Sequence, residues 1–395
     1  MDELTAGAIA APEPPMELML VLTHACNLAC DYCYAGPKDG RAMPEAVARR
    51  GIAWVFDHCG GRLLLGWFGG EPLLRWDLLT ALHGHAAGEA RSRRIPLSGT
   101  LTTNATLLTA DRMAWLADHG ITVAVSIDGD AETHDRLRPL ASGGSSFSAV
   151  RAGLRVALDR QPMTHTVSVV HPGNVPNLDR TVGFLLEEGV RQISLSPDPS
   201  ADWDSRGLEI YREQLELVGE RWLGEFRAGR EVWIEPLDGK IISRVKGGLE
   251  NCDRCAAGTR RLALAPSGNW YPCERMVGAD GDRERFWALG NTLETMDGGP
   301  DPMTVAVLRA QQKDVPAECR RCPLGNRCHY GCSCSNVLAT GTIATPGGAM
   351  CAAEQAAIAV ADRVAVALWQ EGNPLFLRRR YFLEVGRCTR RKGSF

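Results

Sequence analysis

The sequence predicts an α/β fold in which a parallel β-sheet with helical crossovers is followed by a cysteine-rich region. Between residues 16 and 204, six short apolar runs alternate with longer amphipathic runs. This alternation is typical of a parallel sheet with right-handed crossovers. From 251 to 354 the sequence shows neither helical nor strand periodicity, and Gly, Pro and Cys dominate instead. Such a composition is expected where metal ligation, more than apolar burial, organises a segment.

The predicted strands and helices follow one another in a regular order. Strands are expected at 16–23, 62–68, 97–103, 121–127, 165–170 and 191–196. Helices are expected between them at 44–59, 72–90, 109–120, 146–160 and 177–189. Pro44 and Pro72 stand at first-turn positions, and Gly120 and Gly189 at C-terminal ends. Strand number and length fit a partial (β/α)6 barrel, but a doubly wound open sheet gives the same alternation, so both architectures stay open at this point.

Composition and periodicity also divide the chain into segments. We expect a disordered N-terminal segment at 1–15, the strand-and-helix domain at 16–204, a helical bridge at 205–250, the cysteine-rich domain at 251–354, and a C-terminal helix with a basic tail at 355–395. The C-terminal helix is expected to begin slightly before its segment, at 351–372.

The net charge and the lengths of the apolar runs argue against several classes of protein. A net charge of −3 gives no general attraction to nucleic acid or to an anionic membrane. The N-terminus is acidic where a signal peptide needs basic residues, and no run approaches the ~18 apolar residues of a membrane span. We therefore expect a cytoplasmic protein with neither nucleic acid nor membrane as a partner. In a reducing compartment, the 14 cysteines are expected to bind metal before they form disulfides.

The first cysteine group is Cys26, Cys30 and Cys33, spaced C-x3-C-x2-C directly after the first predicted strand. Three thiolates can hold three irons of a [4Fe–4S] cube, whose usual complement is four cysteines. The fourth iron is then open to a ligand with oxygen and nitrogen donors. A structural zinc site would need a fourth protein ligand, and His24, two residues before Cys26, is awkwardly placed to supply it.

The stretch CNLACDYCY, residues 26–34, resembles the cluster motif of the radical S-adenosylmethionine (SAM) superfamily, including the aromatic Tyr32 before the third cysteine. The resemblance implies that SAM chelates the open iron through its amino and carboxylate groups. It also implies that reductive cleavage of SAM releases a 5′-deoxyadenosyl radical, which abstracts a hydrogen atom from the substrate.

Three further segments match the same family in order and place. WFGGEPLL (67–74) is similar to its GGE motif, which implies that Glu71 and the Gly69–Gly70 backbone hold the SAM ammonium. TTNATLL (102–108) implies that Asn104 is a polar lining residue, with helix capping as the alternative. SIDGDAETHDRLRP (126–139) implies that Ser126 binds the SAM carboxylate or ribose and that Arg138 clamps a carboxylate. For Asp128, His134 and Asp135 in that segment, capping of turns and helices is the alternative.

The C-terminal cysteines resemble, in their spacing, the SPASM extension of radical SAM enzymes, which carries two auxiliary [4Fe–4S] clusters. By that resemblance Cys252, Cys255, Cys273 and Cys332 bind cluster I, and Cys319, Cys322, Cys328 and Cys351 bind cluster II. Either Cys252 or Cys255 fits the first position, and Cys334 is a possible substitute, so cluster I is either fully ligated or keeps an open iron. Two zinc ribbons are the alternative. The leftover Cys59, Cys334 and Cys388 are expected to be buried or incidental.

The resemblance covers roughly residues 16–355 and selects the partial (β/α)6 barrel, followed by a SPASM domain of loops and helices. It implies SAM and three [4Fe–4S] clusters as cofactors. The function it implies is a radical SAM/SPASM oxidoreductase that cross-links or oxidises a ribosomally made peptide through C–C, C–S or C–O chemistry. The alternatives are sulfatase-maturase-like formylglycine formation on a protein, oxidation of a small molecule such as a sugar, and a non-enzymatic iron–sulfur electron carrier.

The sequence also gives expectations about binding partners and about a general base. Only 25 residues precede Cys26, so recognition of a leader peptide is expected to come from a separate protein or from the enzyme's own surfaces. The reductant is expected to be of the flavodoxin or ferredoxin type. Oxidation needs a proton acceptor, and the candidates are Asp198, Asp202 and Asp204, just after the last predicted strand.

Overall fold

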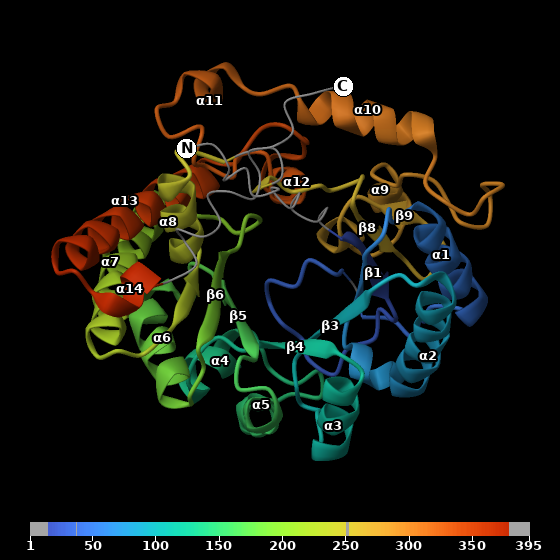
Figure 1. Ribbon diagram of the computed structural model, residues 1–395, viewed down its shortest axis with the longest axis horizontal. Coiled ribbons are helices and arrows are strands. Elements are labelled where there is room, and N and C mark those ends of the chain that lie inside the picture. The colour runs from blue at the N-terminus through green and yellow to red at the C-terminus, as the bar shows by residue number, and fades with distance from the viewer. Residues whose placement is uncertain (1–14, 37, 250–252, 379–395) are drawn as a thin grey trace, which may run out of the picture.

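The computed structural model of the protein describes residues 15–36, 38–249 and 253–378. One curved sheet contains the strands in the order β7-β6-β5-β4-β3-β2-β1-β8-β9 (Figure 1). The six predicted strands are all present, as β1 (Met16–Val21), β2 (Leu63–Phe68), β3 (Leu97–Thr103), β4 (Ile121–Ser126), β5 (His165–Val170) and β6 (Gln192–Pro197). Each pairs in parallel with its neighbour in chain order. A doubly wound sheet reverses its strand order, whereas this one does not, so the barrel architecture is confirmed.

Helices on the outer side of the curved sheet make the crossovers (Figure 1). They are α1 (Glu45–His58), α2 (Trp76–Arg93), α3 (Ala110–Asp118), α5 (Phe147–Arg160) and α6 (Leu178–Glu187). Three shorter pieces lie in the loops: η1 (Pro72–Arg75), α4 (Ala131–Leu137) and η2 (Val175–Asn177). Gly120 and Gly189 follow α3 and α6 with φ of 67° and 92°, the left-handed conformation that glycine adopts readily after a helix.

One part of the predicted helical bridge is a strand. Within 205–250, α7 (Ser205–Arg227) and α8 (Leu237–Val245) are helices, but β7 (Trp233–Glu235) lies between them and extends the sheet parallel to β6. The expectation of a purely helical bridge is therefore wrong. Three residues are too few to show a strand period.

The cysteine-rich region also contributes to the sheet, although only loops and helices were expected there. β8 (Arg261–Leu264) pairs in parallel with β1, and β9 (Trp270–Tyr271) pairs antiparallel with β8. The hairpin turns at Gly268, whose φ is 88°. This hairpin fastens the region directly to the first strand of the barrel, beside the cysteine loop.

The remaining elements of the cysteine-rich region are short, as expected. They are η4 (Glu274–Met276), α9 (Asp282–Arg285), α10 (Pro302–Gln312), α11 (Ala317–Arg321) and α12 (Ser333–Thr340). The C-terminal helix α13 runs over Gly348–Gln370 and is followed by α14 (Pro374–Arg378). α13 packs along α7 and α8 (Figure 1), where a buried ion pair joins Lys240 to Glu354 at 2.7 Å.

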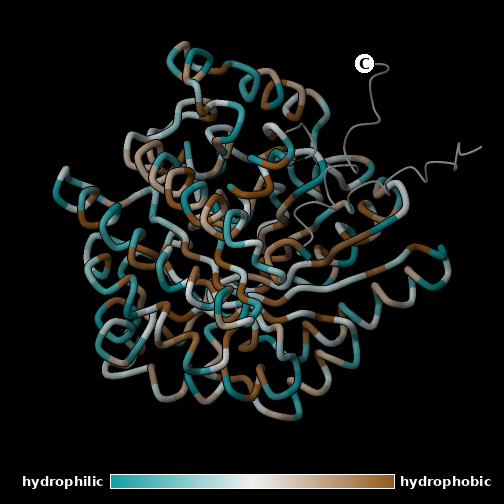
Figure 2. The backbone as a smooth tube through the Cα atoms, turned by 60° about the vertical axis from the view of Figure 1, so that its left-hand side comes forward, coloured by the Kyte–Doolittle hydropathy of each residue, from teal (hydrophilic) through white to brown (hydrophobic). Residues whose placement is uncertain are grey.

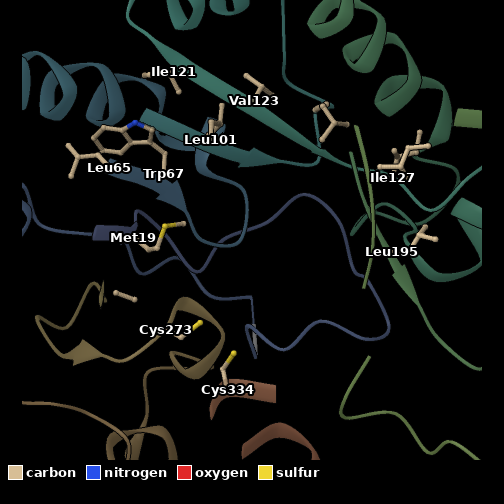
Figure 3. Packing of buried hydrophobic residues seen from close by; sticks show 14 of the residues in the cluster. Met19, Leu65, Trp67, Leu101, Ile121, Val123, Ile127, Leu195, Cys273 and Cys334 are labelled. Atoms are coloured by element: carbon tan, nitrogen blue, oxygen red, sulfur yellow. The ribbon is translucent and has the colours of Figure 1, made fainter. Parts of the chain in front are cut away.

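The core lies inside the curved sheet and under its helices. Hydrophobic residues are concentrated along the interior strands, and hydrophilic residues on the outer turns (Figure 2). Leu65, Trp67 and Leu101 from β2 and β3 are fully buried and lie close together (Figure 3). Among the described residues, no helix is both long and apolar enough to cross a membrane. The predicted segment 1–15 falls almost wholly outside the described residues, as do Cys252 and Cys388, and the division into domains stays a prediction.

Candidate active site

A cavity of about 260 Å³, here the first cavity, opens at the carboxyl ends of the barrel strands. Loops at this end of parallel strands are the usual place for ligands. Ten of the 21 predicted site residues line it together: Cys26, Cys30, Cys33, Tyr32, Gly69, Gly70, Asn104, Ser126, Arg138 and Asp198. The structure therefore brings the loops after β1, β2, β3, β4 and β6 to one place.

Each thiol of the first cavity faces a polar donor from a different part of the fold. Asn104 Nδ2 lies 3.8 Å from Cys26 Sγ, an Arg138 terminal nitrogen 3.9 Å from Cys30 Sγ, and Lys38 Nζ 2.8 Å from Cys33 Sγ. Donors and cations in these positions stabilise thiolates and offset the negative charge of a cluster. Three converging thiols with three donors thus fit an iron–sulfur cluster.

Burial favours the protonated form of two of these thiols, those of Cys26 and Cys30. Burial raises the pKa of the Cys26 thiol to about 11. Burial also raises the pKa of the Cys30 thiol, against the opposing effect of the Arg138 charge. Metal ligands must be deprotonated, so loading of the site releases protons. The zinc alternative needed His24, which is buried beneath the loop rather than lining the cavity.

The two glycines of the GGE motif allow two loops to touch. The Gly70 N–H donates to Thr23 O at 2.8 Å, and the Glu71 N–H to Ala25 O at 2.9 Å. A Cβ on Gly70 would lie 2.2 Å from Ala25 O, and one on Gly69, where φ is 140°, would lie 2.5 Å from Thr23 O. No larger residue fits at either position. The motif thereby fixes the start of the cysteine loop as well as lining the cavity.

The Glu71 carboxylate is fully buried and accepts hydrogen bonds from other residues of the chain. Its Oε1 accepts hydrogen bonds from Leu73 N at 2.9 Å and Thr103 Oγ1 at 2.8 Å, and its Oε2 from Asn104 N at 2.8 Å. Burial raises the pKa of Glu71 to about 6, against these three donors. The carboxylate therefore joins the loops after β2 and β3, and its contact with the SAM ammonium stays a prediction.

Substituting Glu71 by Gln should destabilise the protein without changing the shape of the side chain. The amide nitrogen would face at least one buried N–H donor that the carboxylate now satisfies, and an unsatisfied buried donor costs about 1–3 kcal/mol. Thermal unfolding of the reconstituted protein under anaerobic conditions measures the loss. The control is Glu45→Gln, which breaks only the exposed pair with Arg49 and should have a far smaller effect. Equal effects of the two substitutions would contradict the structural role of Glu71.

A buried polar network lies behind the cysteine loop and centres on Asp128. Arg138 Nε is 3.1 Å from Asp128 Oδ2, as an ion pair without the alignment of a hydrogen bond. The Tyr32 hydroxyl donates to the same oxygen, and Val169 N donates to Oδ1 at 3.0 Å. The Arg138 guanidinium lies over the Tyr32 ring, 5.2 Å from its centroid. This network fixes the direction in which Arg138 reaches the cavity, and a carboxylate clamp by Arg138 stays a prediction.

Two neighbours of Asp128 serve the fold. Asp135 Oδ1 accepts from Ser146 N at 2.9 Å and Phe147 N at 3.0 Å, so Asp135 caps the start of α5. His134 Nδ1 accepts from Asp128 N at 3.3 Å, and its Nε2 lies 3.0 Å from Ser146 Oγ. For these two residues the geometry is that of the capping alternative.

Only one of the three predicted base candidates reaches the first cavity. Asp198 is buried, its Oδ1 accepts from Ser200 N at 2.9 Å and Ser200 Oγ at 2.7 Å, and its Oδ2 accepts from no residue that the structure describes. Asp202 and Asp204 line a separate depression of about 350 Å³. Asp204 also caps α7 by accepting from Gly207 N at 2.6 Å. Asp202 and Asp204 follow β6 closely in the sequence but do not line the first cavity.

The sequence reasoning missed two residues on the opposite wall, Glu274 and Arg275 of η4. Glu274 forms an ion pair with Arg261 at 2.9 Å. Burial acts to raise the pKa of Glu274, but the charges of Arg261 and Arg275 and the hydrogen bonds of Glu274 together leave that pKa below its ordinary value. Their position directly after Cys273, a predicted ligand, was the one available signal.

A second cavity, of about 510 Å³, lies between the cysteine-rich region and β6. All four cysteines predicted for cluster II line it, namely Cys319, Cys322, Cys328 and Cys351. Cys332 and Arg275 line it too, and Arg275 is shared with the first cavity. Among the described residues, no three His, Cys, Asp or Glu side chains form a site for a single metal ion.

Comparison with known proteins gives a family match over part of the chain and relatives over most of it. The family model of the radical SAM superfamily matches residues 20–185. The serine-type anaerobic sulfatase-maturating enzyme of Klebsiella aerogenes is 27% identical over 350 residues, 82% of this chain and 80% of that protein. The PqqA peptide cyclase of Granulibacter bethesdensis is 27% identical over 345 residues, 83% and 85% of the two chains.

A solved structure shows the same fold. The structure of native anSMEcpe with bound AdoMet and peptide matches with a TM-score of 0.77 at 20% identity, over 91% of this chain and 100% of that one. The family implies SAM and a [4Fe–4S] cluster as cofactors, for which the first cavity offers three thiols at the expected place. Residues 20–185 therefore carry a radical SAM domain, and the chain is an enzyme that is similar over four fifths of its length to a sulfatase-maturating enzyme and to a peptide cyclase.

Proposed function

We propose that the protein oxidises one Ser or Cys side chain of a peptide or protein substrate, in the manner of the sulfatase-maturating enzymes it resembles. What carries this proposal is the composition of the first cavity, in which three thiols, the Gly69–Gly70 backbone and two carboxylates face one space. The relatives favour this reaction over the natural-product cross-linking that the sequence suggested first. Cross-linking stays the second candidate because of the similarity to a PqqA peptide cyclase.

The cofactor supplies the difficult step, and the chain supplies position and charge. When bound, SAM and its cluster provide a 5′-deoxyadenosyl radical that takes a hydrogen atom from the substrate. Cys26, Cys30 and Cys33 would hold the cluster. Gly69, Gly70, Asn104, Ser126 and Arg138 line the cavity around those thiols and would orient SAM.

Oxidation of a Ser side chain from –CH2OH to –CHO removes one hydrogen atom, one proton and one electron. The proton needs a base, and Asp198 and Glu274 are the carboxylates that line the first cavity among the described residues. Glu274 is committed to Arg261, whereas one oxygen of Asp198 is free of described donors. We therefore assign the base to Asp198.

Substituting Asp198 by Asn tests the base. Product formation should fall about 10²–10⁴-fold, the usual contribution of a general base, while 5′-deoxyadenosine release continues because hydrogen abstraction does not need the carboxylate. Both products are quantified by liquid chromatography and mass spectrometry, with Glu274→Gln measured beside it. A larger and equally selective loss in Glu274→Gln would move the base to Glu274.

The electron needs an acceptor, and the cysteine-rich region offers ligands for one. We propose three [4Fe–4S] clusters in all, with Cys319, Cys322, Cys328 and Cys351 holding auxiliary cluster II around the second cavity. About twelve irons per chain are then expected after anaerobic reconstitution. A flavodoxin- or ferredoxin-type reductant and a cytoplasmic, reducing compartment fit such chemistry, and a separate leader-binding protein is needed only for the second candidate.

The deciding experiment uses the reconstituted protein with SAM, a reductant and two peptides that differ only by Ser or Ala at one position. We expect 5′-deoxyadenosine release and, in the Ser peptide, a mass loss of two hydrogen atoms together with reactivity toward hydrazide. The Ala peptide should stay unmodified. A cross-link without an aldehyde would support the second candidate, and absence of SAM cleavage would reject both.

A further inference from the structure

Three thiols lie close together at the start of α12: those of Cys273 and Cys332, both predicted ligands of cluster I, and that of Cys334, a leftover cysteine and possible substitute. Cys332 is the N-cap residue of α12, and Cys334 is the second residue of its first turn. Cys334 is only 4% exposed, and its Sγ lies 3.5 Å from Cys332 Sγ. Its thiol also interacts with that of Cys273. In Figure 3 the sulfur atoms of Cys273 and Cys334 lie in the same small space.

Packing as a buried apolar residue does not explain the thiols that surround Cys334. Cys59 is buried to a similar degree, but its Sγ contacts only Phe56 O, at 3.7 Å, in its own helix. That is the behaviour of a cysteine that packs as a small apolar residue. Cys334 instead lies beside two other free thiols, those of Cys332 and of Cys273, and Cys273 comes from the loop after β9. Several unpaired thiols gathered in one place are a typical donor set for a metal cluster.

The surroundings favour negative charge at these thiols. Cys332 and Cys334 lie at the N-cap and in the first turn of α12, and the N-terminus of a helix stabilises anions. The Arg275 guanidinium lies close enough to Cys334 and Cys273 for their charges to interact. Cys255, in turn, is close enough to Cys273 and Cys332 for the same. Cys255, Cys273, Cys332 and Cys334 are therefore candidates for one set of donors beside a cation.

We propose that Cys334 is the fourth protein ligand of auxiliary cluster I, together with Cys255, Cys273 and Cys332. This inference rests on the proposed function, because it takes the auxiliary clusters from it. It leaves Cys252 without a ligand role and gives cluster I the full complement of four thiolates. A fully ligated cluster has no open iron for a substrate, so cluster I serves the reaction as an electron acceptor and not as a substrate-docking site.

The test uses the full chain carrying Cys26→Ala, Cys30→Ala and Cys33→Ala, so that only auxiliary clusters remain. Cys334→Ala, Cys252→Ala and the matched buried control Cys59→Ala are each added to this background. After anaerobic reconstitution, iron and acid-labile sulfide are counted, and the reduced clusters are examined by electron paramagnetic resonance (EPR).

We expect Cys252→Ala and Cys59→Ala to keep about eight irons and both cluster signals. Cys334→Ala should either fall to about four irons or keep the iron with one altered signal that shifts again on addition of cyanide, as an open iron does. Cys334→Ser, which preserves the volume of the side chain, is the second variant in case the alanine variant does not fold. It should alter the same signal, because oxygen replaces sulfur at the iron.

The assignment is overturned if Cys334→Ala and Cys334→Ser match the Cys59→Ala control, if Cys252→Ala is the variant that loses iron, or if the sites hold zinc. These results are independent of the proposed function, which is tested by 5′-deoxyadenosine release and peptide oxidation in the unsubstituted chain. Normal auxiliary signals without peptide oxidation would reject the function and leave the ligand assignment standing.

Discussion

Replacing Cys26, Cys30 and Cys33 by alanine is expected to abolish release of 5′-deoxyadenosine. These thiols line the first cavity together and are the protein ligands at the place where SAM is to bind. Without them nothing holds the iron that SAM needs, so the whole reaction is lost rather than slowed. Iron content should fall from about twelve to about eight per chain. The measurements are iron analysis and chromatographic quantification of 5′-deoxyadenosine.

The matched control for this prediction is Cys59→Ala. Cys59 is also buried near the barrel strands, yet it lines neither cavity. Its removal should leave iron content and SAM cleavage at the level of the unsubstituted protein, with a modest loss of stability from the small cavity it creates. SAM cleavage by the three-alanine variant would refute the assignment of the cluster. An equal loss in Cys59→Ala would show that the thiols act through folding alone.

The sequence could predict those parts of the fold that have a long local signal. The six strands β1 to β6 and the crossover helices are each long enough to show a hydrophobic period, and the spacing of Cys26, Cys30 and Cys33 lies within one loop. β7 and β9 have three and two residues, too few to show any period. β7 joins the sheet through β6, and the β8–β9 hairpin joins it through β1, and both are contacts between remote parts of the chain that no local pattern records.

The candidate site, like the fold, could be predicted from the sequence only in part. Residues that follow a strand directly, such as Ser126 and Asn104, were placed correctly at the cavity because the carboxyl ends of parallel strands meet. Glu274 was missed because the β8–β9 hairpin carries it to the site from far along the chain. For Glu71 the motif predicted the position, but not the partners: its carboxylate is occupied by Leu73, Thr103 and Asn104. The orientation of a buried carboxylate depends on its hydrogen-bond donors, and these come in part from other loops.

Asp128→Asn is expected to cause a large loss of stability. Asp128 is the buried counter-charge of Arg138, at 3.1 Å, and it accepts from the Tyr32 hydroxyl and from Val169 N. Asn keeps the shape but removes the charge, so a buried guanidinium is left without its partner. Breaking a buried pair in this way costs about 3–5 kcal/mol. We expect a marked fall in the midpoint of thermal unfolding under anaerobic conditions, and a loss of iron from the cysteine loop that Arg138 contacts.

A double substitution separates charge from packing. If the loss comes from the unpaired guanidinium, Asp128→Asn combined with Arg138→Gln should be less damaging than the sum of the two single substitutions, with a coupling of about 1–3 kcal/mol. Asp118→Asn, which breaks only the exposed pair with Arg160, is the surface control and should cost less than about 1 kcal/mol. Strict additivity of the Asp128 and Arg138 substitutions would contradict the ion pair as the source of stability. Coupling would show that the loop holding Cys30 depends on a charge pair contributed by the loop after β4, so the cluster site is built from both loops at once.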